Sequence, residues 1–141
     1  SFLNSLADDV IPIVSSVTAG SNLGDIGFNV NADDVAGIIA SKIAAEKLIL
    51  MTDVEGVLDE NGQLLSSLTV SQVEELIAKK VIHGGMIPKV QTCLDALRGG
   101  AQKCHIIKGS VHSFMDEILT DSGVGTEFIK DKLVRKTVNK V

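Results

Sequence analysis

The sequence has little cysteine and no long apolar run. Its two cysteines, Cys93 and Cys104, are too few for the disulfide framework of a small secreted domain, and both lie among apolar residues. We expect them to be free, buried thiols in a reducing compartment. No apolar stretch approaches the roughly eighteen residues that a membrane-spanning helix needs, so we expect no membrane partner.

The amino terminus lacks both parts of a secretory signal. Residues 1–10 contain neither a basic region nor a long apolar region, and they begin with serine instead of an initiating methionine. Processing or truncation of the chain therefore stays open. We predict a cytoplasmic protein, or a protein of an organellar matrix if the source is a eukaryote.

Positive charge is scarce as well. The formal net charge is −5 at pH 7, whereas general nucleic-acid binding needs clustered lysine and arginine, so we expect no nucleic-acid partner. Residues 130–141 are the exception, since lysine and arginine outnumber the single acid, Asp131. We interpret them as a solvated basic C-terminal tail or terminal helix, with contact to an acidic partner as the alternative.

The sequence does contain enough apolar residues to bury one core. Hydrophobic residues make up 45% of the chain and charged residues 22%, which favours a single ordered domain without repeats or linkers. Apolar, β-branched runs predict buried strands at residues 10–17, 47–54 and 103–109, and a last strand at 125–130. An Asn61-Gly62 pair between short apolar runs predicts a hairpin.

The stretches between these strands have the apolar spacing of helices. We predict helices over residues 31–47, 69–82, 88–100 and 111–121. Strands that are buried on both faces and alternate with helices are typical of a parallel sheet covered by helices. The predicted fold is therefore α/β, a layered α/β/α arrangement with a largely parallel central sheet.

The predicted helices begin and end at residues that suit those positions. Asn31 or Asp33 can serve as the cap or first-turn acid of the first helix. The second has a Thr/Ser start with Glu74 downstream, as in a capping box. Pro88 suits the first turn of the third helix, and two glycines close that helix at residues 99–100.

Three polar clusters stand at the predicted strand ends and helix starts: residues 29–34, 52–56 and 83–89. Folds of this class bind ligands at the carboxyl ends of strands and at helix N-termini. Neither a GxxxxGK[ST] loop nor a GxGxxG loop is present, so nucleotide binding would need another architecture.

The stretch "HGGMIPKV" at residues 83–90 allows two interpretations. Its glycines can simply form a tight turn before a helix. Alternatively, amides gathered at the helix N-terminus can form an anion cradle beside Lys89. A lysine near a helix N-terminus opposes the helix dipole, and this small penalty favours a use for it.

Four motifs resemble one known family. "NVNADDVAG", "LILMTDVEGV", "HGGMIPKV" and "HIIKG…GVGT" occur in the order and at the spacing of the carboxyl-terminal half of N-acetylglutamate kinases, in the amino acid kinase superfamily. The resemblance covers roughly residues 8–129. It implies that residues 1–129 form the nucleotide-binding half of an amino acid kinase-like domain, with 130–141 as a tail.

The resemblance also implies an activity and its cofactors. The family transfers the γ-phosphoryl group of ATP, bound with Mg²⁺, to the carboxylate of N-acetyl-L-glutamate in arginine biosynthesis. Phosphoryl transfer depends on positioning and charge neutralisation, so a lysine, a carboxylate, glycine amides and Mg²⁺ are its expected parts. The histidines and cysteines form no metal-ligand pattern, and we expect no metal other than Mg²⁺ with the nucleotide.

Matching positions imply roles for individual residues. Lys89 corresponds to the lysine that touches the transferring phosphoryl group, and Asp33 to the aspartate that organises the catalytic lysines. Asn29, with Asn31 beside it, corresponds to the substrate-binding asparagine. The implied nucleotide contacts are Thr52, Asp53, Gly84, Gly85 and Met86.

Structural alternatives remain open for several of these residues. Asp33 can be a first-turn acid that favours the helix dipole, and Asn29 and Asn31 can be ordinary loop and cap residues. Asp53 can end a strand in a turn, and Met86 can fill the core.

The segment after residue 111 resembles the part of arginine-sensitive family members that binds feedback arginine. His112, Glu117 and Gly125 match that segment, so the resemblance implies inhibition of the full enzyme by L-arginine. The alternative is a partly exposed histidine on a packed helix.

The chain departs from the family pattern in one large respect. Complete members have an amino-terminal half with a second catalytic lysine, glycine-rich phosphate loops and a substrate-binding arginine, and nothing before Ser1 supplies them. We therefore expect a fragment or one piece of a split enzyme, inactive alone, whose complete form is a homo-oligomer. Two alternatives remain: another superfamily kinase, acting on aspartate, glutamate, carbamate or a nucleoside monophosphate, and a non-catalytic nucleotide- or effector-binding fragment.

Overall fold

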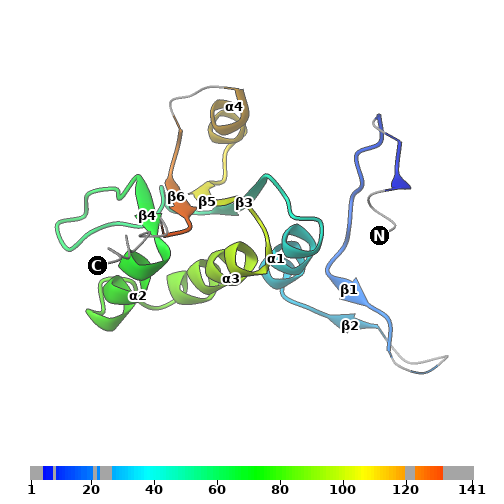
Figure 1. Cartoon of the computed structure of the whole chain (residues 1–141), viewed down its shortest axis with the longest axis horizontal. Coiled ribbons are helices and arrows are strands. Elements are labelled where there is room, and N and C mark those ends of the chain that lie inside the picture. Colours follow the sequence, from blue (N-terminus) through cyan, green and yellow to red (C-terminus); the bar gives the residue numbers. More distant parts are fainter. Residues whose placement is uncertain (1–4, 8, 21, 23–26, 120–122, 132–141) are drawn as a thin grey trace, which may run out of the picture.

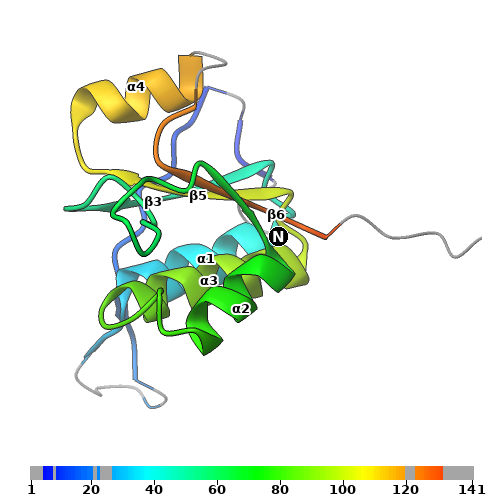
Figure 2. The same cartoon turned by 90° about the vertical axis from the view of Figure 1, so that its left-hand side faces the viewer.

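The computed structural model of the chain defines residues 5–7, 9–20, 22, 27–119 and 123–131. A central sheet is covered by α1, α2 and α3 on one face and by α4 on the other (Figures 1 and 2). The elements are β1 (Val17–Thr18), β2 (Phe28–Asn29), α1 (Ala32–Lys42), β3 (Lys47–Thr52), β4 (Ser67–Thr69), α2 (Val70–Ala78), α3 (Met86–Gly99), β5 (Lys103–Lys108), α4 (Val111–Leu119) and β6 (Thr126–Ile129).

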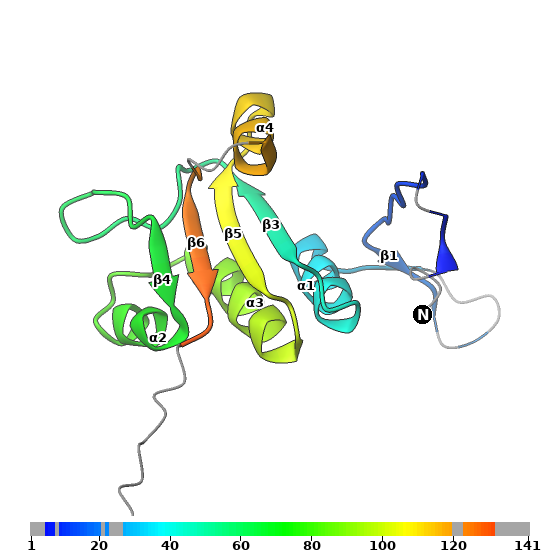
Figure 3. The ribbon, with the colours of Figure 1, turned by 45° about the horizontal axis from the view of Figure 1, so that its top comes forward.

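The central sheet has the strand order β3-β5-β6-β4. β3 runs parallel to β5 and β4 runs parallel to β6, while β5 and β6 are antiparallel (Figure 3). The prediction of a layered α/β fold with a largely parallel sheet is therefore confirmed. β1 and β2 form a separate antiparallel pair.

The core lies between this sheet and α3. β5 is the most deeply placed strand, because its four middle residues, 104–107, are all buried. Burying one aliphatic or aromatic side chain of this size stabilises a fold by about 1.5–3 kcal/mol. The largest fully buried apolar side chains are Phe128, Leu94, Leu97, Ile106, Ile107, Val57, Val73 and Val90.

The helices lie where the apolar spacing predicts them, although their ends differ. α1 begins after Asn31, whose side-chain oxygen accepts a hydrogen bond from the Asp33 amide at 2.9 Å, as expected of a cap. It ends at Lys42, five residues before the predicted end, because Ala44 takes a left-handed φ of 50°. α3 begins two residues earlier than predicted, at Met86.

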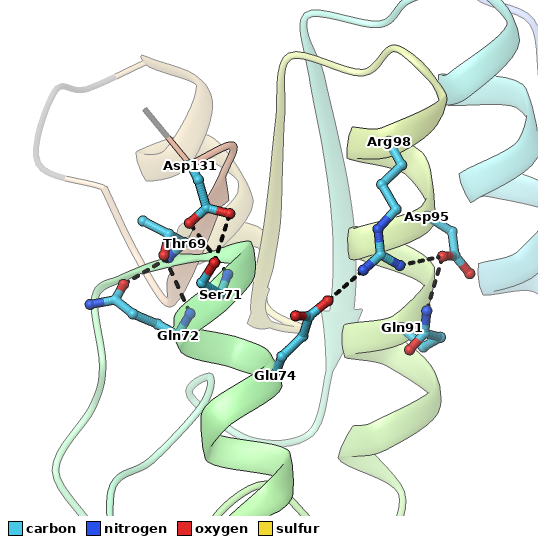
Figure 4. A network of polar contacts seen from close by, with 8 residues as sticks. All are labelled: Thr69, Ser71, Gln72, Glu74, Gln91, Asp95, Arg98 and Asp131. Carbon is cyan, nitrogen blue, oxygen red and sulfur yellow. Dashed lines mark hydrogen bonds and ion pairs between the residues drawn. The ribbon is translucent and has the colours of Figure 1, made fainter. Parts of the chain in front are cut away.

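α2 begins with a capping box, but its partner residue is not the predicted one. The Thr69 hydroxyl accepts from the Gln72 amide at 3.4 Å, and the Gln72 side chain accepts from the Thr69 amide at 2.8 Å (Figure 4). Glu74 is too far along the helix for this role because the box needs the third helical residue. The Ser71 hydroxyl also donates a hydrogen bond to the Asp131 carboxylate at 3.1 Å, which joins the residues just after β6 to the first turn of α2.

Removing the Thr69 hydroxyl is expected to destabilise the protein modestly. Thr69→Ala should lower the free energy of unfolding by about 1 kcal/mol, since one amide of α2 loses its partner. Thr69→Ser keeps the hydroxyl and should stay within about 0.5 kcal/mol of the wild type. Urea unfolding checks both values, and equal losses in the two variants would contradict the cap assignment.

The segment that leads to β1 contradicts its prediction. We expected a buried strand over residues 10–17, yet Ile11 is 87% exposed and Ile13 is 96% exposed, and only Val17–Thr18 is extended in a pair. The segment stands apart from the central sheet beyond α1 (Figure 3). An apolar run is buried as a strand only where other apolar residues cover it. The described residues do not cover these two isoleucines.

The hairpin prediction is confirmed. Leu58 and Leu64 form an antiparallel bridge, and Gly62 between them has a φ of 77°. Separately, no helix in the described part of the chain is long and apolar enough to cross a membrane.

Candidate active site

The connections place two helix N-termini at one edge of the sheet. α1 leads into β3 and α3 leads into β5 through short turns, so each helix runs against the strand that follows it. The starts of α1 and α3 therefore lie near the carboxyl ends of β3 and β5, which end at residues 52 and 108. This edge is where ligands bind in open α/β sheets.

An ion pair joins the two helix starts. The Lys89 Nζ lies 2.7 Å from the Asp33 Oδ2, although 56 residues separate them in sequence. Their side chains are 24% and 25% exposed, so the pair is partly shielded but open to a ligand. Asp33 offsets the unfavourable position of a lysine near a helix N-terminus and holds the ammonium group in place.

The two asparagines lie just ahead of α1, and the structure separates them. Asn31 is the helix cap, so the structural alternative accounts for its side chain. Asn29 is exposed at the end of β2, where it pairs with Val17. Of the two, Asn29 is the one that remains a candidate for substrate contact.

The loop before α3 has one glycine that the backbone requires and one that it does not. Gly84 has a φ of 58°, which side-chain-bearing residues rarely adopt, whereas Gly85 has a φ of −67°. A Cβ at Gly85 would meet nothing within 4 Å. Neither backbone conformation nor packing within the described chain requires a glycine there, which fits a site where a ligand comes close.

The amides at this helix start are partly occupied. No side chain caps α3, but Met86 and Ile87 donate to the carbonyls of His83 and Gly84 at 3.3 and 3.2 Å. A phosphate would therefore be held by the remaining amides of the glycine pair together with Lys89. Of the two interpretations of this stretch, the anion cradle would be limited to these groups.

A small cavity lies beside the same loop. It has a volume of about 180 Å³, and mostly apolar side chains line it. Met86 connects this cavity to the helix start, while Thr52 and Asp53, joined by a 3.2 Å hydrogen bond, end the neighbouring strand. The lining comes from two segments: Val54, Gly56, Val57, Leu58, Val81, Ile82, His83 and Met86.

The polar clusters predicted at residues 52–56 and 83–89 contain half of this lining, and Met86 alone was assigned as a nucleotide contact. Sequence reasoning did not find Val57 or Ile82, which are buried core residues by pattern. Only their positions could have indicated them, since Val57 follows the polar cluster after β3 and Ile82 lies two residues before Gly84.

A second polar cluster surrounds Glu117, on the α4 side of the sheet. Its carboxylate accepts from the Lys47 Nζ at 2.6 Å, from the His105 Nδ1 at 2.8 Å and from the Val124 amide at 3.0 Å. The His105 Nε2 is buried without a hydrogen-bond partner. A neighbouring cavity of about 470 Å³ is lined by Lys47, Ser66, Ser67, Lys103, His105, Glu117, Gly123, Val124, Gly125 and Glu127.

The three residues predicted for an effector site are only partly brought together. Glu117 and Gly125 line this cavity, but His112 does not, and its side chain is exposed. His105 takes the place next to Glu117 instead. Its signal in the sequence is a histidine inside a run of otherwise apolar strand residues, where burial makes a polar partner necessary.

Burial and neighbours shift the titration of this cluster. Burial lowers the pKa of the His105 imidazolium and outweighs the attraction of the Glu117 carboxylate. Burial alone would raise the pKa of the Glu117 carboxyl, but the hydrogen bonds from Lys47 and the Val124 amide lower it overall.

Both shifts predict lower stability in acid. A lowered histidine pKa favours the neutral form in the folded state, so this contribution is lost as the pH falls through the unfolded value of 6.5 toward the folded one. The Glu117 contribution is lost at lower pH, as the pH falls below its unfolded value of 4.5 and through its folded pKa. We expect thermal unfolding between pH 7.5 and pH 3 to show both losses, and His105→Gln to remove only the first. A wild-type melting temperature that rises on acidification to about pH 5 would contradict these directions.

Within the described residues, no group of three histidine, cysteine, aspartate or glutamate side chains is placed to hold a metal ion. Cys93 and Cys104 are free and buried, as predicted.

Comparisons with known proteins agree on one family. Residues 2–108 match the model of the amino acid kinase family. The acetylglutamate kinase of Wolinella succinogenes is 46% identical over 129 residues, which are 91% of this chain and 45% of that protein. The chain thus spans less than half the length of this relative.

Two solved structures share the fold. The N-acetylglutamate synthase of Neisseria gonorrhoeae, solved with coenzyme A and L-arginine, has a TM-score of 0.70 and 26% identity over 77% of this chain and 25% of that one. The carbamate kinase of Giardia lamblia, solved with AMP-PNP, has a TM-score of 0.62 and 19% identity over 78% of this chain and 36% of that one. The second likeness concerns the fold alone.

The family match, the sheet topology and the acetylglutamate kinase relative agree, and the chain belongs to the amino acid kinase family, within which its sequence matches the acetylglutamate kinases.

Proposed function

We propose that this chain supplies the nucleotide-binding half of an acetylglutamate kinase, which transfers the γ-phosphoryl group of ATP to the carboxylate of N-acetyl-L-glutamate in arginine biosynthesis. The observation that carries the proposal is the 2.7 Å ion pair between Lys89 and Asp33 at the carboxyl edge of β3 and β5. It presents a positioned cation where this fold binds ligands.

The residues at this edge suit a nucleotide. The apolar cavity beside Met86 can take the adenine, and the open glycine pair at residues 84–85 leaves room for phosphates. Lys89 then neutralises phosphoryl oxygens, and Asp33 acts as a positioning residue that keeps the ammonium group in place. Mg²⁺ would arrive with the nucleotide and supply further positive charge on the phosphates.

The acceptor would lie ahead of α1. Asn29 is exposed two residues before the α1 cap, so its amide can donate to the acetylglutamate. Asn31, whose oxygen caps the helix, orients this segment. We place the reaction in the cytoplasm or an organellar matrix, and we propose that the complete enzyme is a homo-oligomer.

Joining the chain to the part of a relative that it does not match tests this function. The chain is joined to the part of the Wolinella succinogenes enzyme that it does not match, and ADP release is followed with N-acetyl-L-glutamate, aspartate, glutamate, carbamate or uridine monophosphate. We expect turnover only with N-acetyl-L-glutamate, and none from the chain alone. Turnover with another acceptor would favour a different kinase of the superfamily.

We further propose that the Glu117 cavity binds L-arginine as an inhibitor. Its lining carries both lysines and glutamates, which suits a zwitterion with a cationic side chain, and it includes His105, whose Nε2 has no hydrogen-bond partner among the described residues. The related synthase was solved with L-arginine. We expect L-arginine to inhibit the assembled enzyme, Glu117→Gln to abolish inhibition, and His112→Ala to leave it intact.

A further inference from the structure

Lys108 is a second lysine at the edge where the candidate active site lies, and the function proposed above does not use it. It is the last residue of β5 and pairs in register with Thr52, the last residue of β3. The amide of Gly109 donates to the Thr52 carbonyl at 2.6 Å, so the two strand ends are fixed beside each other. Lys108 therefore stands next to a predicted nucleotide contact.

The alternation of side chains along β5 places Lys108 on the same face as the ion pair. Cys104 and Ile106 belong to the core that includes α3, and Lys108 is the next residue of that series. On β3, Leu48 and Leu50 belong to the same core, followed by Thr52. The side chains of Thr52 and Lys108 are therefore on the face of the sheet that α1 and α3 cover.

An ion pair holds the Lys108 side chain near the small cavity. Its Nζ lies 2.5 Å from the Glu55 Oε1, and Glu55 stands between Val54 and Gly56, which line that cavity. The side chains of Lys108 and Glu55 are 49% and 62% exposed. An ion pair this exposed contributes little to stability, so Lys108 can leave Glu55 at small cost.

The charge of this edge calls for more than one cation. Asp33, Asp34, Asp53 and Glu55 lie in its loops and first turns, and Asp33 already offsets Lys89. Mg²⁺ bound to a nucleoside di- or triphosphate offsets part of the repulsion between its phosphates and these carboxylates, and a further protein cation facing the phosphates would offset more of it. Lys108 is a half-exposed cation next to the cavity, on the face where α3 begins.

We propose that Lys108 is a phosphate-binding residue of the nucleotide site, which exchanges its contact with Glu55 for the polyphosphate of a bound nucleotide. The inference rests on the proposed nucleotide-binding function and adds a specific residue to it. The exchange breaks one exposed ion pair and forms a charge-assisted contact to an anion of higher charge, which is favourable in a partly enclosed site.

Calorimetric titration with MgADP and with adenosine tests the proposal. Lys108→Ala should weaken MgADP binding about fivefold to tenfold and leave adenosine binding unchanged, because only MgADP carries phosphates. Arg98→Ala is the matched control, since Arg98 lies at the far end of α3, is 50% exposed and pairs with Glu74. It should change neither affinity.

Tripolyphosphate separates failure of this inference from failure of the proposed function. If the folded wild type binds no MgADP, the nucleotide site is not functional in this chain, and tripolyphosphate alone then decides whether Lys108 binds phosphate. Side-chain NMR should show a tripolyphosphate-dependent shift of the Lys108 ammonium resonance, which is assigned by its loss in Lys108→Ala, and no shift of the Arg98 guanidinium resonance. Unchanged MgADP affinity in Lys108→Ala, or no tripolyphosphate-dependent shift at Lys108, would overturn the proposal.

Discussion

Gly125→Ala is expected to lower the free energy of unfolding by about 2–5 kcal/mol. Gly125 has a φ of 76°, which costs a side-chain-bearing residue about 1–2 kcal/mol. A Cβ there would overlap the carbonyl oxygen of Ile106 and lie 3.0 Å from the Ile107 Cα. Both atoms belong to the backbone of the buried strand β5, which cannot yield without disturbing its neighbours, and overpacking adds about 1–3 kcal/mol.

Gly84→Ala is the matched control for this prediction. Gly84 also has a positive φ, of 58°, but a Cβ there would meet nothing within 4 Å. This variant should lose only the conformational part, about 1–2 kcal/mol. Urea unfolding of both variants isolates the cost of crowding, and equal losses would show that the contact with β5 contributes nothing.

Lys89→Ala is expected to reduce turnover of the assembled kinase about 10²-fold to 10³-fold, the cost of removing one group that stabilises a transition state. MgADP affinity should fall only about tenfold, because ground-state binding also uses the cavity beside Met86. Asp33→Asn keeps the size of the side chain but removes its charge. It should lower kcat about 10²-fold while Lys89 remains present but is no longer held in position.

An ion pair elsewhere on α3 provides the control. Arg98 pairs with Glu74 of α2 at 2.6 Å, and both side chains are at least half exposed (Figure 4). Arg98→Ala removes a cation from the same helix, far along it from the candidate site, and should leave kcat unchanged. Steady-state kinetics of the three variants test these expectations. A loss of kcat in Arg98→Ala equal to that in Lys89→Ala would show that the effect comes from the folding of α3.

The sequence was sufficient where local chemistry decides the structure. Asn31 is a cap residue followed by apolar positions at helical spacing, and α1 begins there. The glycines at residues 99–100 end α3 in the same way. The pairing of Lys89 with Asp33 was of another kind, because it joins residues 56 positions apart. Only the resemblance to a family indicated it.

The failures have physical causes as well. Ile11 and Ile13 have the pattern of a buried strand, yet both are exposed. An apolar pattern shows that burial would be favourable, but it does not show which residues would cover the segment. His105 was passed over because it sits in an apolar strand, and the carboxylate that satisfies its Nδ1 comes from α4, twelve residues later. Contacts between elements of this kind depend on tertiary placement, which periodicity does not contain.

An NMR titration of the chain with MgADP tests the central claim most directly. We predict saturable shifts of backbone amides at residues 52–58, 81–89 and 108–109, around the carboxyl ends of β3 and β5 and the start of α3, with the amides of β4 and β6 unaffected. Lys89→Ala should weaken the binding and keep the pattern. A folded chain whose amides do not respond to MgADP, or respond only around Glu117, would contradict a nucleotide site at this edge.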